Sequence, residues 1–227
     1  AAAQSDLTEL LASNNVYSDN LTINSAATLA VAKNLGGKLA IINGNVTISQ
    51  SSSLNAAELQ EVLDVMVTVT GNISYTMTVN SSTQATFDNL TSVGDLTLDV
   101  AGDINFPVLE NAGKVTLNTT HKNYVTSVEF PVLSSVTSFY TGSDADAIDF
   151  PKATAVTLTA LVNYEGVASD LTIGGKLNFT LDLAALTSKK SSGAKNAIDL
   201  IIKGAAEVNL PEFTEGSIVA NTSAKVV

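Results

Sequence analysis

A short strand motif recurs along the chain and constrains its fold more than any other feature. The motif is a polar residue, an aliphatic residue, Thr or Ser, and an apolar residue, with copies at Asn20–Ile23, Asn45–Ile48, Asn72–Tyr75, Asp95–Leu98, Lys114–Leu117, Ala155–Leu158 and Asp170–Ile173. The first five copies begin at residues 20, 45, 72, 95 and 114, so successive starts are 25, 27, 23 and 19 residues apart. Repetition at a period of about 20 to 50 residues is typical of solenoids, propellers and arrays of one supersecondary unit.

A second motif precedes several of these strands. Phe87, Phe106 and Phe130 each begin a segment in which the residues three, six and nine positions later are also apolar. The copy at Phe150 keeps the first two of these positions, and Leu210–Phe213 is a weaker copy. All four prolines of the chain stand in the second position of the motif, at Pro107, Pro131, Pro151 and Pro211. Because Pro cannot donate a ladder hydrogen bond, we expect a recurrent corner at this phase of the repeat.

Together the motifs predict a mainly β fold, a right-handed single-chain β-solenoid with parallel stacked coils. A coil of about 20 to 25 residues would pair its strand with the equivalent strands above and below, about 4.8 Å away. We expect one domain over residues 1–227, with a helix-containing N-terminal cap and the first coils in residues 1–64 and repeat coils in residues 65–227. Stacking of neighbouring coils would bury the apolar side chains.

Three short helices are predicted near the N-terminus, over residues 6–12, 25–35 and 55–63. Asp6, Ser25 and Asn55 are suited to the N-cap positions, and Gly36 to the end of the second helix. Because an exposed terminal coil offers unpaired edge groups, we expect these helices to cover the open end or one side of the first coils.

Charge and missing residue types exclude several partners. The chain has 22 acidic and 11 basic residues, all of the latter Lys, for a formal net charge of −11. Nucleic acid binding needs clustered cations, usually with Arg, so we expect no nucleic-acid partner. Cys is absent, which removes disulfides and thiol chemistry. No apolar run approaches the about 18 residues of a membrane-spanning helix, so no transmembrane segment is expected.

From Phe87 to Leu158 the Phe-Pro-x-Leu spacing, followed by aliphatic-Thr-aliphatic strands, resembles the receptor L-domain-like and leucine-rich-repeat-type surface proteins. The same pattern occurs in bacterial cell-surface lipoproteins and adhesin-like proteins and in fungal cell-wall proteins. The resemblance implies a right-handed β-solenoid with ligand-binding or adhesive duties, and it supplies no catalytic residues. The chain begins without an initiator Met or a basic segment, so we expect an extracellular or cell-surface protein whose signal or lipid anchor has been removed.

Asp144, Asp146 and Asp149 form the tightest acidic cluster and are the candidate metal ligands. Ca²⁺ binds several carboxylate and carbonyl oxygens, which makes it the candidate ion. The cluster lacks the Gly and the distal Glu of a twelve-residue calcium loop, so a solvated acidic turn is the favoured interpretation. No other cofactor is expected.

Tyr124, Tyr140 and Tyr164 are the candidate ligand-binding residues, because Tyr can replace the missing Trp as a platform for sugars. The competing interpretation places them at loops or sheet edges, with Tyr75 packed inside. His121 is the only His and lies in a polar segment. A general base or metal site normally needs a partner group, so we predict that His121 is a solvated loop residue.

Eight Asn-x-Ser/Thr sequences are present, at Asn20, Asn45, Asn72, Asn80, Asn89, Asn118, Asn178 and Asn221. In a secreted eukaryotic protein they would be glycan acceptors. Turn-forming Asn before a Thr-rich strand produces the same pattern, and we favour this structural interpretation.

The leading functional hypothesis is a non-catalytic cell-surface or secreted binding or adhesion module that presents a polar, Thr- and Asn-rich face to a glycan or a protein. One alternative is a structural spacer within a surface protein, and another is a carbohydrate-active β-helix enzyme. The enzyme is disfavoured because lyases of this shape typically use a basic residue, often Arg, and Arg is absent. No catalytic residue is assigned, since no acid–base constellation stands out.

Overall fold

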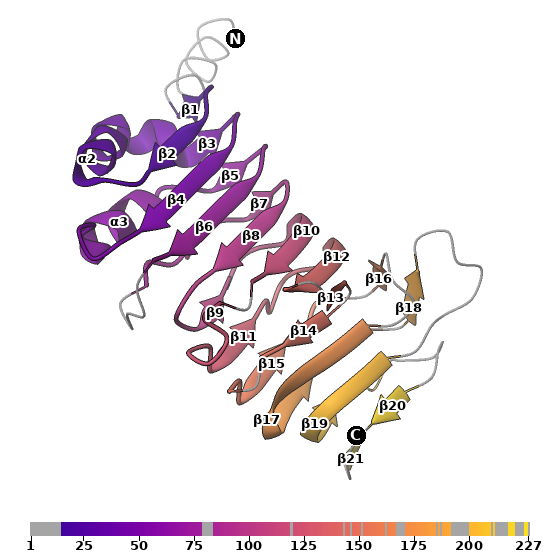
Figure 1. The fold of residues 1–227 in the computed structure, drawn as a ribbon. Helices are drawn as coiled ribbons and strands as arrows, with labels where there is room; N and C mark the ends of the chain where they lie inside the picture. Colours follow the sequence, from indigo (N-terminus) through magenta and orange to yellow (C-terminus); the bar gives the residue numbers. More distant parts are fainter. Residues whose placement is uncertain are drawn as a thin grey trace, which may run out of the picture.

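The structure is a computed structural model that describes residues 15–78, 84–118, 120–142, 144–145, 147–150, 152–161, 163–166, 171–184, 186, 188–191, 200–209, 211, 218–220 and 225–226. Short strands succeed one another along an elongated array, and two helices lie along one flank of its N-terminal part (Figure 1).

The first sheet is mostly parallel and has 11 strands among the described residues. Its strands are β1 (Val16–Tyr17), β2 (Leu21–Ile23), β3 (Ile41–Ile42), β4 (Val46–Gln50), β5 (Thr68–Val69), β6 (Ile73–Met77), β7 (Ser92–Val93), β8 (Leu96–Asp99), β10 (Asn111–Leu117), β12 (Ser135–Thr141) and β13 (Asp144–Ala145). Strands β2, β4, β6, β8, β10 and β12 pair in parallel in that order, so copies of the strand motif lie beside one another. The short strands β1, β3, β5 and β7 form a second parallel series, and β10 joins both series.

A second sheet of 8 strands follows the C-terminal part of the described chain. It contains β9 (Ile104–Asn105), β11 (Ser127–Glu129), β14 (Ala147–Asp149), β15 (Ala155–Thr157), β17 (Leu171–Asp182), β19 (Leu200–Asn209), β20 (Ile218–Ala220) and β21 (Lys225–Val226). A separate parallel pair joins β16 (Asn163–Gly166) to β18 (Ser188–Ser191).

Two of the three predicted helices are confirmed, and the third lies outside the described residues. Helix α2 (Ala26–Leu35) begins at Ser25, whose side chain forms a reciprocal capping box with Thr28, and it is followed by the 3₁₀ helix η1 (Gly36–Ala40). Helix α3 (Ala56–Leu63) begins at Asn55, whose Oδ1 accepts hydrogen bonds from two backbone N–H groups. These caps satisfy backbone donors that would otherwise be unpaired at the start of each helix.

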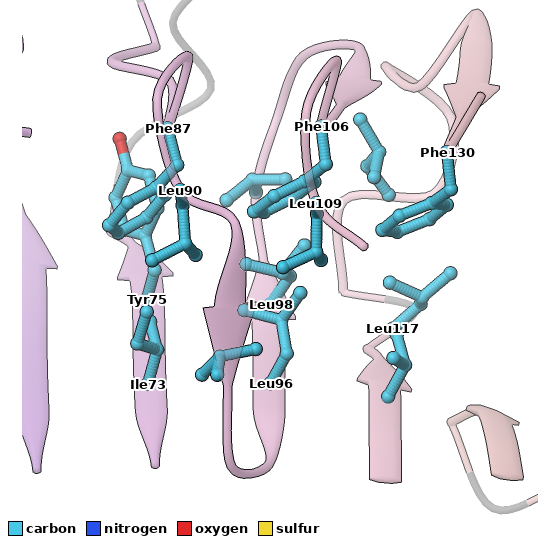
Figure 2. Close-up of a cluster of buried hydrophobic side chains, with 14 of the residues drawn as sticks. Ile73, Tyr75, Phe87, Leu90, Leu96, Leu98, Phe106, Leu109, Leu117 and Phe130 are labelled. Atoms are coloured by element: carbon cyan, nitrogen blue, oxygen red, sulfur yellow. The ribbon is translucent and has the colours of Figure 1, made fainter. Parts of the chain in front are cut away.

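The apolar positions of the second motif all lie in the core. Phe87, Phe106 and Phe130 are buried, as are the residues three, six and nine positions after each of them. The Phe106 ring stacks on Phe87 at 6.0 Å and on Phe130 at 5.3 Å between centroids. Tyr75 meets Phe87 edge to face at the other end of this stack. Figure 2 shows the rings packed behind the strands, with Leu side chains between them. Turns follow Phe106 and Phe130 at the predicted corner.

The predicted right-handed single-chain β-solenoid is wrong. Strands are parallel and pair between motif copies, but they form open sheets in an α/β-type arrangement. The connections β2 to β3 and β4 to β5 are helices, and β13 turns back antiparallel to β12. The physical reason is local: segments 26–35 and 56–63 can bury one apolar side as a helix, through residues such as Leu29 and Leu59. Both helices lie beside the first strands (Figure 1), on one side of the array, which is one of the two positions expected for them.

Candidate functional site

Five hydroxyl side chains share one register position on five neighbouring strands of the first sheet. We call them the hydroxyl row: Thr22, Thr47, Ser74, Thr97 and Thr116, on β2, β4, β6, β8 and β10. Each lies between two buried residues of its strand, and because strand side chains alternate between faces, the row is on the outer face. Neighbouring members are about 4.8 Å apart, the separation of paired strands.

The hydroxyl groups of the row make no hydrogen bond to another residue in the described part of the chain. Other Thr hydroxyls are used inside the fold: Thr91 Oγ1 donates to Val67 O at 3.0 Å, and Thr159 Oγ1 donates to Pro131 O at 2.8 Å. A hydroxyl is both donor and acceptor, so the row presents unused groups of both kinds to the solvent.

A ladder of side-chain hydrogen bonds runs two residues before the row, at the residue that precedes each of the strands β2, β4, β6 and β8. We call it the Asn ladder: Asn20, Asn45, Asn72 and Asp95. Each Oδ1 accepts a bond from the backbone N of the next repeat, at 2.8, 2.8, 2.9 and 2.8 Å, the last donor being Lys114 N. The preceding glycines leave room for this contact, since a Cβ on Gly71 would lie 2.5 Å from Gly44 O. The ladder therefore holds the strands, and the row, in register.

Asn residues of four Asn-x-Ser/Thr sequences make structural hydrogen bonds, as the structural interpretation expects. Asn20, Asn45 and Asn72 belong to the Asn ladder. Asn89 Nδ2 donates to Asp64 O at 2.7 Å and so joins a turn to the end of α3.

Tyr140 follows Thr116 in the same register position, on β12. Lys114 Nζ lies over the Tyr140 ring, 4.1 Å from its centroid. This cation–π contact occupies one side of the ring and marks the C-terminal end of the row. Of the three predicted ligand-binding tyrosines, Tyr140 is the one that the structure brings next to the row.

The other two tyrosines lie elsewhere. Tyr124 is exposed in a turn, where its N–H donates to His121 O at 2.9 Å. Tyr164 belongs to β16, in the small separate sheet, and its side chain is outside the described part. Tyr75 is buried as expected. Its hydroxyl group contacts Gln50 Oε1 and accepts a hydrogen bond from Ala85 N.

The prediction that His121 is a solvated loop residue is wrong. Its side chain is buried, with 8% of the residue exposed, and its Nε2 lies 2.9 Å from Met77 O. The polar neighbours Lys122 and Asn123 are exposed, which explains why the sequence suggested exposure for the whole segment. His121 therefore packs at the C-terminal end of β6, beside Met77.

The candidate calcium ligands are separated by secondary structure. Asp144 lies in β13, Asp149 lies in β14, and Asp146 is outside the described residues, as are the side chains of the other two. Within the described ranges, no group of three His, Cys, Asp or Glu residues is arranged to hold a metal ion. The calcium hypothesis therefore stays a prediction.

A cavity of about 150 Å³ lies between α2, η1 and α3, lined by Ala32, Lys33, Gly36, Leu39, Glu61, Val62 and Val65. Lys33 Nζ is 3.2 Å from Glu61 and 3.6 Å from Glu58. The hydrogen bond to Glu61, with the nearby charge of Glu58, raises the pKa of Lys33. Lys33 and Glu61, which both line the cavity, thus form an ion pair, and this pair favours the protonated form of the Lys33 amine.

The continuous hydroxyl row is the feature that sequence reasoning missed as a site. The signal was present, because the third position of the strand motif is Thr or Ser in each copy. Among the described helices, none is long and apolar enough to cross a membrane. No protein-family model, curated protein or solved structure matches the chain.

Proposed function

We propose that this chain is a non-catalytic binding module of the cell surface or the secreted space, which presents the hydroxyl row to a glycan or a protein. The observation that carries the proposal is the alignment of five hydroxyl groups without bonds to the described residues. Thr hydroxyls that serve the fold donate to backbone carbonyls, as Thr91 does. The hydroxyl groups of the row can donate hydrogen bonds to a ligand in the same way.

The rigidity of the face supports this proposal. The Asn ladder ties each strand to the next by a side-chain bond in addition to the sheet bonds. A ligand that binds a preorganised face loses less free energy to the ordering of protein side chains and loops. Weak single contacts can then add up along the row.

A glycan array and a matrix-protein array test the proposal. Wild-type protein is expected to bind at least one component, and the Thr47→Val, Thr97→Val double variant to bind it at least about tenfold more weakly, equivalent to about 1.4 kcal/mol. Valine keeps the shape and strand preference of Thr but removes the hydroxyl. Thr157→Val, on β15 of the second sheet, is the matched control and should bind as wild type does.

Two results would contradict the proposal. Absence of binding on both arrays would leave the structural spacer as the better interpretation. Release of shortened sugars from an array polysaccharide would instead favour the carbohydrate-active enzyme.

A further inference from the structure

We infer that the ligand of the hydroxyl row is a neutral, extended polysaccharide whose chain lies along the row, across the strands. This inference rests on the binding function proposed above and names the chemical class of its ligand. It rests on the spacing and charge of the row and on the side chains around it.

The spacing of the row suits a polymer with a short, regular repeat. Five hydroxyl groups recur at about 4.8 Å, so the row extends over about 19 Å. An extended β-linked polysaccharide advances by a comparable length with each sugar and presents hydroxyl groups along its edges. Successive sugars would therefore meet successive strands, and each sugar hydroxyl would find a donor or an acceptor.

Charge around the row favours a neutral polysaccharide. The row itself carries no charge. Asp95, just before β8, and Asp99, at its end, lie two residues to either side of Thr97, while the charge of Lys114, two residues before Thr116, lies over the Tyr140 ring. The whole chain has a net charge of −11. A sulfated or uronic acid polysaccharide would be repelled by this field, which disfavours its approach and binding.

The hydroxyl row contains none of the large residues that anchor protein interfaces. Binding energy between proteins is concentrated in a few large residues, above all Trp, Tyr and Arg, that enter pockets on the partner. The large apolar side chains exposed in the described part are Val31, Val67, Val108, Tyr124 and Val132, and none belongs to the row. A hydroxyl surface matches a sugar better than it matches an apolar protein patch.

Separate hydroxyl contacts along the row favour a long ligand. The cavity lined by residues of α2, η1 and α3 contains no member of the row. A single sugar at one hydroxyl position makes few contacts and binds weakly, whereas a chain that spans several positions makes all of its contacts after one association event. The Lys114–Tyr140 contact lies at the end of the row and so limits the length of polysaccharide that can contact the row.

Uncharged β-1,4-linked glucan oligosaccharides of increasing length, together with the insoluble polymer, test the inference. Affinity is expected to rise with each added sugar until the oligosaccharide spans the five positions of the row, and then to level off. The carboxymethylated polymer should bind more weakly, and added salt should reduce this difference.

Variants connect the binding to the row. The Thr47→Val, Thr97→Val protein should lose at least about tenfold in affinity for the insoluble polymer, about 1.4 kcal/mol. Thr47→Ser, Thr97→Ser restores hydroxyl groups and should recover binding, and Thr157→Val should leave it unchanged. A thermal melt of each variant confirms that it is folded.

The outcomes separate this inference from the proposed function. Binding of a matrix protein that is lost in the valine variant, without binding of glucan, overturns the polysaccharide and leaves the binding module intact. Equal binding of glucan by the wild type and the valine variant overturns the inference, because another surface would then be responsible. Absence of any binding overturns both.

Discussion

The side-chain Oδ1 of Asn45 accepts a hydrogen bond of 2.8 Å from the backbone N of Asn72, although the two residues are 27 positions apart. Val46 N donates in return to Asn72 O, also at 2.8 Å. Side chain and backbone thus join the same two repeats at one corner. Because the hydroxyl row begins two residues later on each strand, this corner determines how accurately the row is aligned.

Replacement of Asn45 is expected to weaken the Asn ladder. Asn45→Ala removes the acceptor for Asn72 N and should lower the free energy of unfolding by about 0.5–1.5 kcal/mol, the usual net value of one hydrogen bond. Asn45→Asp keeps an oxygen in the same place and is the matched control. Chemical denaturation measures both, and an alanine variant as stable as wild type would contradict a structural role for the ladder.

A methyl group at Gly71 should be poorly tolerated. Its Cβ would lie 2.5 Å from Gly44 O, a backbone atom that cannot move without disturbing the neighbouring repeat. We expect Gly71→Ala to destabilise the fold by about 1–3 kcal/mol. At Gly37 a Cβ would lie 3.6 Å from Asn15 Oδ1, so Gly37→Ala should change stability by less than about 0.5 kcal/mol. Equal effects at both positions in thermal melts would refute the close approach.

Removal of the Phe106 ring from the aromatic stack is expected to be costly. It contacts Phe87 at 6.0 Å and Phe130 at 5.3 Å between centroids, so Phe106→Ala leaves a cavity between two rings. The loss should be about 3–5 kcal/mol. Val108→Ala, two residues away at a position that is 36% exposed, should cost less than about 0.5 kcal/mol. Urea denaturation compares the two variants.

Tyr75 should make stability depend on pH in the alkaline range. Burial raises the pKa of its hydroxyl group, so above the unfolded-state pKa of about 10 the unfolded chain loses this proton while the folded chain retains it. Stability contributed by Tyr75 is therefore present below pH of about 10 and is lost as pH rises further.

Tyr75→Phe is expected to remove this contribution, and its stability should fall less steeply above pH of about 10 than that of wild type. At neutral pH the variant should be less stable by about 1–3 kcal/mol, because the hydrogen bonds that the Tyr75 hydroxyl group makes with Gln50 Oε1 and with the Ala85 N–H are lost. Chemical denaturation at a series of pH values measures the stability difference at neutral pH and its change above pH of about 10. Equal pH dependence of stability in the variant and the wild type would show that folding does not change the pKa of Tyr75.

The calcium hypothesis for Asp144, Asp146 and Asp149 has a direct test. An ion that binds only the folded chain raises Tm with concentration, so millimolar Ca²⁺ should raise Tm in wild type and fail to do so when all three residues are changed to Asn. An unchanged wild-type Tm would leave the solvated acidic turn as the interpretation of the cluster.

Several features follow from the sequence alone, for local physical reasons. Ser25 and Asn55 cap helices because their side chains bond to backbone N–H groups two or three residues away. The Phe106 segment buries Phe106, Leu109, Ala112 and Val115, the positions that its apolar spacing predicts. Such features depend on neighbours within about ten residues of chain.

The tertiary structure decided the rest, because the deciding contacts join residues far apart in the chain. His121 is buried because Met77, 44 residues earlier, lies beside it, and its own polar neighbours gave no sign of that contact. The predicted β-solenoid was wrong for the same reason. A strand pattern indicates which side chains face inward, but it does not determine how the strands are arranged into sheets. The sequence by itself determined a Thr or Ser in each repeat, and only the parallel register aligned Thr22 to Thr116 into one row.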